Sequence, residues 1–273
     1  MTSEPSSTVE GRRGCDRAGG EPTYRFLGQV ARGLNTLIGP RLWLDQHKVP
    51  ASGAVLVVSN HISKYDPLVL GDYLISSGRW PRFLGKSDLW STPVVGFFAR
   101  GCRQIPVERN TIRAGDSLKA AREALDAGEM VAIYPEGTIT ADPETWPMTA
   151  RTGAARLALE TRCPVLPVGQ WGANHFMPGK KLTHPRVLPR KPLLAKAGDL
   201  LDLSDLYDAP DRHQAVRVAS ERMMEAITRL TAELRQEQAP EDRYDIRKKQ
   251  RVPKGSTSLA DPDEQPPVQP GVL

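Results

Sequence analysis

The sequence predicts an α/β fold, a mixed sheet flanked by helices and preceded by an N-terminal amphipathic helical segment. Two observations lead to this class. Short apolar runs with the length of buried strands recur along the chain, and stretches with helical periodicity alternate with them. The clearest run is Ala54–Val58, which is rich in β-branched residues. Strands are expected near residues 54–59, 82–86, 103–108, 129–134 and 164–169.

Helices are expected over residues 117–127, 152–161 and 212–236, where apolar side chains recur at three-and-four spacing. Gly128 is a stop signal for the first helix, and Pro164 follows the second. The stripe on the third helix forms a single packing face, which is typical of contact with a core or a partner.

The stretch Tyr24–Trp43 also has near-helical apolar spacing, and Gly39-Pro40 breaks or kinks it. Such a helix either packs on the core or lies in a membrane interface, and the two cases have the same sequence pattern. The segment Leu89–Phe98 is dense in aromatic and apolar residues outside a clear strand. It is a better candidate for lipid contact than the helix before it.

These patterns divide the chain into five parts. The expected parts are a disordered leader (1–22), the amphipathic helical segment (23–48), a central α/β domain (49–206), a C-terminal helix packed on that domain (207–238) and a disordered, charged and Pro-rich tail (239–273).

The composition fits one domain with a core, since 39% of the 273 residues are hydrophobic. No apolar run approaches the roughly 18 residues that span a bilayer, and the first twenty residues lack the apolar segment of a secretory signal. The three cysteines are widely spaced, which favours neither a disulfide framework nor a metal site. Cys102 and Cys163 are expected to be small core residues.

The net charge of +5 is unevenly distributed, with basic clusters in residues 179–196 and 241–254. A nucleic-acid partner is not expected, because the clusters contain no interleaved aromatic residues and no recognisable binding motif. Attraction to an anionic membrane surface is the functional interpretation. A solvated tail is an equally good interpretation of the C-terminal cluster.

The segment Asn60–Pro67 carries the strongest indication of chemistry. His61 follows the apolar run Ala54–Val58 and should emerge at the carboxyl end of that strand, where active sites of α/β sheets lie. If a helix begins near Ser63, the carboxylate of Asp66 can reach one imidazole nitrogen and leave the other free to take a proton. In isolation, such a pair is more often a capping arrangement.

Three more segments accompany this pair: Gly101–Arg109, Tyr134–Thr138 and Cys163–Val168, each at or near a predicted strand. Together with Asn60–Asp66, they resemble the four sequence blocks of the glycerolipid acyltransferase family, which includes the 1-acylglycerol-3-phosphate acyltransferases. The blocks occur here in the family's order, over roughly residues 53 to 170.

The resemblance implies that His61 is the base acting on a substrate hydroxyl and that Asp66 orients it. It assigns substrate binding to Arg109, as the phosphate anchor, and to Glu136, Gly137 and Thr138. Glu136 is expected to meet an acceptor hydroxyl or to orient Arg109, and Gly137 to permit close backbone approach. Taken alone, the Pro-Glu-Gly segment would be read as a simple turn.

The resemblance also implies the reaction: transfer of a fatty acyl group from acyl-CoA or acyl carrier protein, without a further cofactor, to the lysophosphatidate acceptor. The expected location is cytoplasmic, peripheral to the inner face of the cell membrane. One departure concerns the acceptor, because Ile139-Thr140 replaces the usual Arg-Ser and the nearest downstream base is Arg151. Another lysolipid, glycerol-3-phosphate, or a non-catalytic lipid-binding role therefore remain as alternatives.

Overall fold

The computed structural model describes residues 22–107, 114–179 and 185–255. A seven-stranded sheet forms its centre, in the order β1-β7-β6-β2-β5-β3-β4. The five strands from β6 to β4 are parallel, and β7 runs antiparallel to β6. The sheet strands are β1 (Arg41–Leu44), β2 (Val55–Ser59), β3 (Pro81–Lys86), β4 (Ile105–Val107), β5 (Met130–Ile133), β6 (Val165–Trp171) and β7 (Leu193–Ala197).

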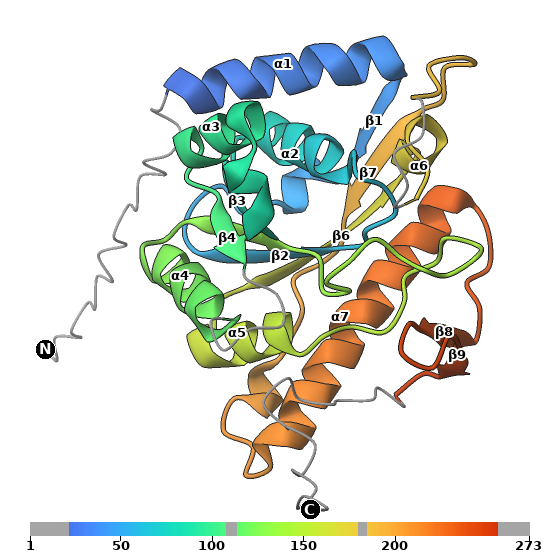
Figure 1. Cartoon of the computed structure of the whole chain (residues 1–273). Coiled ribbons are helices and arrows are strands. Elements are labelled where there is room, and N and C mark those ends of the chain that lie inside the picture. The colour runs from blue at the N-terminus through green and yellow to red at the C-terminus, as the bar shows by residue number, and fades with distance from the viewer. Residues whose placement is uncertain (1–21, 108–113, 180–184, 256–273) are drawn as a thin grey trace, which may run out of the picture.

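Helices cover both faces of this sheet (Figure 1). On one side lie α1 (Pro22–Ile38), α2 (Asp66–Ser76) and α3 (Pro93–Gly101). On the other lie α4 (Ala114–Asp126), α5 (Gly153–Thr161) and α7 (Arg212–Arg235). The remaining helices are short: α6 (Ala173–Phe176), η2 (Gln46–Lys48), η3 (Ser87–Ser91) and η4 (Ser204–Leu206). The α/β class and the flanked, mixed sheet predicted from the sequence are confirmed.

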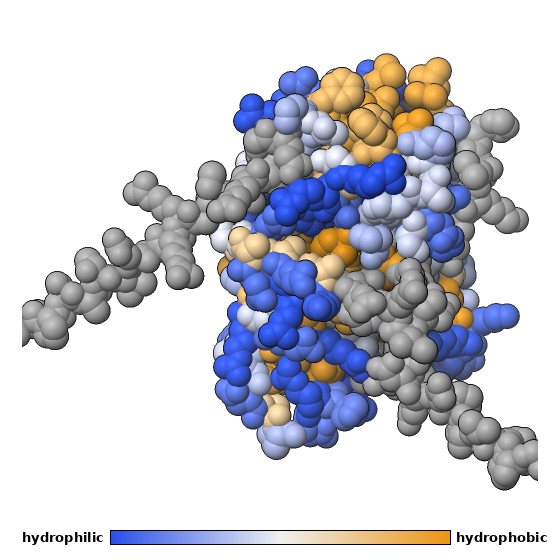
Figure 2. All heavy atoms as spheres, turned by 60° about the vertical axis from the view of Figure 1, so that its left-hand side comes forward, coloured by the Kyte–Doolittle hydropathy of each residue, from blue (hydrophilic) through white to orange (hydrophobic). Residues whose placement is uncertain are grey.

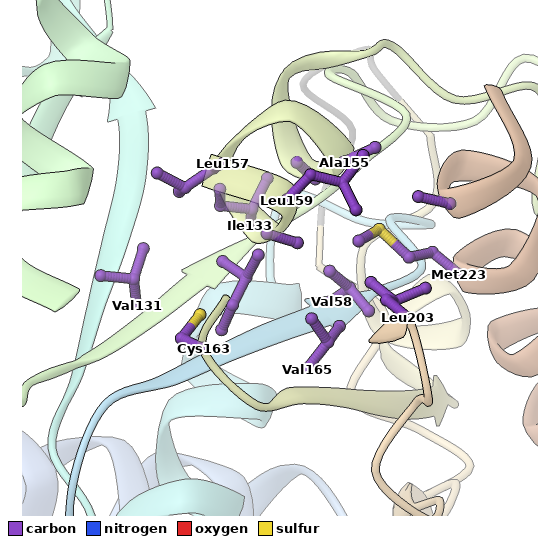
Figure 3. Close-up of a cluster of buried hydrophobic side chains, with 14 of the residues drawn as sticks. Val58, Val131, Ile133, Ala155, Leu157, Leu159, Cys163, Val165, Leu203 and Met223 are labelled. Atoms are coloured by element: carbon purple, nitrogen blue, oxygen red, sulfur yellow. The ribbon is translucent and has the colours of Figure 1, made fainter. Parts of the chain in front are cut away.

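The core sits between the sheet and the helices on each face. Every residue of β2 is buried, as expected for a central strand with helices on both sides. Figure 3 shows the cluster beneath α5 and α7, where Val58, Val131 and Val165 of three strands meet Leu157 and Met223. Cys102 and Cys163 are buried, as predicted.

The predicted helical segment 23–48 is only partly helical. α1 ends at Ile38, because Gly39-Pro40 cannot continue it, and Arg41–Leu44 forms the edge strand β1 instead. β1 pairs in parallel with β7, a strand that the sequence analysis missed. Side chains alternate in burial along both strands. β7 is short and lies in a basic region, so its apolar positions form only a weak strand pattern in the sequence. Residues 1–21 of the predicted leader lie outside the described residues.

The prediction of a disordered tail is wrong for the residues just after α7. Strands β8 (Asp242–Asp245) and β9 (Gln250–Pro253) form an antiparallel hairpin. Arg243 is buried in an ion pair with Glu221 of α7, and the composition gave no sign of it because paired and solvated charges look the same in sequence. Residues 256–273 lie outside the described part of the chain.

The segment Leu89–Phe98 also has regular structure, forming η3 and the first part of α3. Several of its apolar side chains stay exposed. Among the described residues, no helix combines the length and apolar character needed to cross a membrane.

Candidate active site

The loop between β2 and α2 carries His61 at the carboxyl end of the parallel sheet, as the strand pattern predicts. Asn60 fixes this loop to the neighbouring strand β6. Its side-chain amide donates to the Gln170 carbonyl at 2.9 Å and accepts from the Gln170 amide at 2.9 Å, and the Gln170 side chain donates to the Asn60 carbonyl at 2.7 Å. Asn60 and Gln170 are both fully buried, so these three hydrogen bonds hold the backbone next to His61 rigidly in place.

One carboxylate oxygen of Asp66 binds three groups of this loop. Its Oδ2 lies 2.8 Å from Nδ1 of His61 and accepts from the amides of Ile62 at 2.6 Å and Ser63 at 2.8 Å. α2 begins at Asp66 itself, and not near Ser63 as the sequence suggested, so the loop wraps back onto the helix start. The expected contact between His61 and Asp66 is present. It is formed by the turn before α2, and not by two residues of the same helix.

Burial dominates the electrostatics of this pair. The fully buried position raises the pKa of Asp66 above its ordinary value, while the hydrogen bonds from His61, Ser63 and Ile62 oppose the rise. A carboxylate held in this way orients the ring through Nδ1 and leaves Nε2 as the nitrogen that can exchange a proton. Within the described residues, Nε2 makes no hydrogen bond.

Tyr134 packs against the His61 ring. The two rings are stacked, with centroids 4.2 Å apart and planes 14° apart. The His61 side chain keeps 15% of its surface exposed, whereas that of Asp66 has none. The imidazole is therefore held by a carboxylate at one edge and an aromatic face on one side, and it reaches solvent only in part.

Glu136 is buried, and both of its carboxylate oxygens accept hydrogen bonds from backbone amides. It is 2% exposed, and its Oε1 accepts from the His61 backbone amide at 2.8 Å. Its Oε2 accepts from the Met148 amide at 3.1 Å. Burial raises the pKa of Glu136 to about 8, against the effect of these two amides. Glu136 thus connects the His61 loop to the segment that follows β5.

Gly137 occupies a backbone conformation with φ of +69°, which favours glycine. A Cβ atom at this position would lie 2.7 Å from Cδ of Arg151, so the close approach expected at Gly137 is made by that side chain. Thr138 is half-buried beside it. Ile139, which stands where the resembling family has arginine, is buried at 7% exposure.

Arg109, the predicted phosphate anchor, lies outside the described residues. Arg151 is the basic residue that the structure does place at the Gly137 turn; its side chain is exposed. Among the described residues, no group of three or more His, Cys, Asp or Glu side chains could hold a metal ion.

The sequence analysis missed Tyr134, Asn60 and Gln170 as parts of the site. Asn60 and Tyr134 do lie within segments singled out as motifs, and their positions next to His61 and Glu136 were available as a signal. No local pattern indicates Gln170, which reaches Asn60 only because β6 and β2 are neighbours in the sheet.

Part of the chain is similar to known acyltransferases. Residues 44–171 match the acyltransferase family model, and this segment contains the His61 loop, Asp66 and Glu136. This match, together with the relatives described next, supports the glycerolipid acyltransferase resemblance seen in the sequence.

Two relatives are similar over part of their length. The chain is 32% identical over 160 residues to a chloroplastic 1-acyl-sn-glycerol-3-phosphate acyltransferase, BAT2, of Brassica napus. This match covers 56% of the chain and 45% of the relative, so the chain spans less than half of that protein. It is 33% identical over 117 residues to a lyso-ornithine lipid O-acyltransferase of Rhizobium meliloti, covering 36% of the chain and 38% of the relative.

The fold has a solved counterpart. The crystal structure of the 1-acyl-sn-glycerophosphate acyltransferase PlsC from Thermotoga maritima superposes with a TM-score of 0.63. The match covers 80% of this chain and 81% of that one at 21% sequence identity. At this identity the likeness establishes a shared acyltransferase fold.

Proposed function

We propose that this protein is an O-acyltransferase that moves a fatty acyl group from acyl-CoA or acyl carrier protein to the free hydroxyl of 1-acylglycerol-3-phosphate. The product is phosphatidate, an intermediate in phospholipid biosynthesis. The observation that carries the proposal is the contact between Nδ1 of His61 and Oδ2 of Asp66, at 2.8 Å, at the carboxyl end of the sheet in a chain of this family.

The proposed mechanism uses the two imidazole nitrogens differently. Asp66 holds Nδ1–H, so Nε2 of His61 removes the proton of the acceptor hydroxyl as its oxygen attacks the thioester carbon. The carbon–sulfur bond then breaks, and the leaving thiolate takes the proton from His61. Ester and free thiol form together, so no covalent bond to the protein is needed.

A phosphate on the acceptor requires a basic side chain near His61. We assign this role to Arg109. Arg151 is a second candidate, because its side chain lies against Gly137, the residue that follows Glu136. A guanidinium group can hold phosphate through two parallel hydrogen bonds. On this assignment Glu136 supports the His61 backbone, and Gly137 and Thr138 line the turn that faces the acceptor.

A second acceptor is favoured by one specific observation. Ile139 is buried where the family has arginine, and one relative is a lyso-ornithine lipid acyltransferase, whose acceptor is named for ornithine and not for phosphate. A lysolipid other than lysophosphatidate, or glycerol-3-phosphate, is therefore the alternative within the same reaction class. A non-catalytic lipid-binding protein is the alternative outside it.

The test measures acceptor-dependent release of free thiol from acyl-CoA and from acyl carrier protein. Lysophosphatidate, lyso-ornithine lipid and glycerol-3-phosphate are offered separately to the purified protein. We expect the highest kcat/KM with lysophosphatidate, and His61→Ala should lower kcat by about 10²–10⁴-fold. The matched control is His213→Ala, because His213 is exposed at the start of α7. No thiol release with any acceptor, or normal release by a folded His61→Ala protein, would refute the proposal.

We also propose that the protein works on the inner face of the cell membrane, bound at its surface through α1 and α3. Large apolar side chains on these helices are exposed: Phe26 at 57%, Leu37 at 67%, Val94 at 66% and Phe97 at 61%. Figure 2 shows hydrophobic residues gathered at the end of the molecule where these helices lie. Exposed apolar groups of this kind on neighbouring elements are typical of a lipid or protein contact.

Charge favours an anionic lipid surface over a protein partner. Neither α1 nor α3 contains an acidic residue, and Arg25, Arg32 and Arg100 are exposed on them. The segment 185–191 adds Arg186, Arg190 and Lys191 without an acid, and Arg190 donates to the Thr36 carbonyl of α1. Each basic residue near such a surface contributes about 1 kcal/mol. Flotation with anionic and neutral vesicles at low and high salt tests this, and equal binding to both would contradict it.

A further inference from the structure

The C-terminal hairpin β8–β9 lies outside residues 44–171, yet it contacts the loop between β5 and α5 that leads into the candidate site. The Thr149 amide donates to the Tyr244 carbonyl of β8 at 2.9 Å. Arg251 of β9 places Nη2 2.9 Å from Oδ2 of Asp142 and 2.7 Å from Oε2 of Glu144. Figure 1 shows the hairpin beside α7, and the loop passes over that helix.

The same loop holds the backbone of His61 from two sides. The Thr140 amide donates to the His61 carbonyl at 2.7 Å. The Met148 amide donates to Glu136, whose other oxygen accepts from the His61 amide. Both backbone groups of His61 are therefore hydrogen-bonded, directly or through Glu136, to residues 140–148, which couples this loop to the His61 backbone.

Asp142 is the point where the hairpin and the loop meet. It is 4% exposed, and its Oδ1 accepts from the Glu144 amide at 2.8 Å while its Oδ2 faces Arg251. A buried carboxylate that loses its cationic partner keeps its desolvation penalty. Asp142 would then either take up a proton or turn toward water. Turning would move Thr140, whose Oγ1 accepts from the Asp142 amide at 3.2 Å.

We propose that Arg251 is a positioning residue: by pairing with Asp142, it fixes the loop 140–149 in the geometry that holds His61. Its kinetic consequence rests on the proposed acyl transfer, whereas its structural consequence does not. The C-terminal hairpin is on this account part of the apparatus around His61, although it lies beyond the segment shared with the family model.

The experiment uses the full chain in four forms: unaltered, Arg251→Ala, Arg251→Lys and Lys248→Ala. Lys248 is an exposed base on the same hairpin and gives a control matched in charge. Selective ¹⁵N-histidine labelling resolves the five histidines by NMR. We expect Arg251→Ala to shift the His61 amide and imidazole signals, and Lys248→Ala to leave them unchanged. Arg251→Lys should restore most of the wild-type position, because a single atom, Nη2, contacts both carboxylates and an ammonium group can replace it.

The kinetic readout separates positioning from general loss of fold. A displacement of about 1 Å can cost about 10²-fold in rate, so we expect a kcat about tenfold lower in Arg251→Ala with little change in acceptor KM. Unshifted His61 signals and an unchanged kcat in Arg251→Ala would overturn the inference. If Arg251→Ala does not fold, Asp142→Asn replaces it and must shift His61 in the same way; unshifted signals in that variant would also overturn it. If the unaltered protein transfers no acyl group, the proposed function fails, and the NMR comparison still decides the role of Arg251.

Discussion

The helices α1 and α7 have similar apolar periodicity in sequence, but α7 turns its apolar face toward the core and α1 leaves its large apolar side chains on the surface. In α7, the apolar residues at three-and-four spacing are buried, including Met223, Ile227 and Leu230. In α1, the large apolar residues at the same spacing are exposed, including Phe26 and Leu37. The face of α1 that touches the protein carries Tyr24, Gly28, Ala31, Asn35 and Ile38.

The difference teaches that periodicity identifies an apolar face without saying what covers it. α7 lies against β6 so closely that a Cβ at Gly169 would be 2.7 Å from Leu230. α1 approaches α2 through small residues, and a Cβ at Gly28 would lie 3.3 Å from Ile75. Its large side chains are then left on the outside, available to a different environment.

The largest expected effect compares an aspartate placed on each helix. Ile227→Asp puts an unpaired charge into the core and should lower the free energy of unfolding by about 4–5 kcal/mol or more. Leu34→Asp, on the exposed face of α1, should change it by about 0.5 kcal/mol or less. Urea unfolding of both variants measures this, and equal losses would mean that the exposed face of α1 is covered in solution.

The second prediction concerns membrane binding by the exposed face. Burial of a side chain of this size contributes about 1.5–3 kcal/mol, so Leu37→Ser should weaken binding to anionic vesicles by about 10- to 100-fold. Its stability in urea should be close to that of the unaltered protein. Val218→Ser, on α7, serves as the control and should leave vesicle binding unchanged; unaltered binding by Leu37→Ser would remove α1 from the membrane contact.

The third prediction addresses the face of α1 that contacts the protein. Nδ2 of the buried Asn35 donates to Oδ2 of Asp72 at 3.0 Å, and Arg41 lies 3.1 Å from the same oxygen. Asn35→Ala should lower the free energy of unfolding by about 1–3 kcal/mol, since Asp72 loses a buried hydrogen bond. Thermal unfolding, with Thr36→Ala as an exposed neighbour for comparison, measures the difference. A loss no greater than that of Thr36→Ala would show that this contact does not hold α1.

The smallest expected effect is that of a single charge. Arg32→Gln on α1 should weaken binding to anionic vesicles by about 1 kcal/mol, or about fivefold, at low salt. The effect should disappear in high salt, because screening shortens the range of exposed charges. Arg217→Gln on α7 carries the same charge change on an exposed residue and should not alter binding. If both variants weaken binding equally, net charge and not the face of α1 attracts the membrane.

Much of the strand pattern and part of the site followed from local sequence. Five strand predictions lie at or next to β2, β3, β4, β5 and β6, because buried strands are short apolar runs. The meeting of His61 with Asp66 followed from their spacing of five residues and the end of a strand before them. Strands β1, β7, β8 and β9 were missed, since their stability comes from partners distant in sequence and not from their own composition.

The sequence by itself determined that the chain has a helix-flanked sheet and that a histidine and an aspartate lie together at a strand end, because both depend on neighbours within a few residues. Only the tertiary structure decided which face of α1 meets the protein, that Glu136 supports the His61 backbone, and that Arg251 reaches Asp142. His61 and Glu136 are 75 positions apart in the sequence, and Asp142 and Arg251 are 109 positions apart. Such pairs meet only when the tertiary fold brings distant segments together, so no pattern of neighbouring residues indicates them.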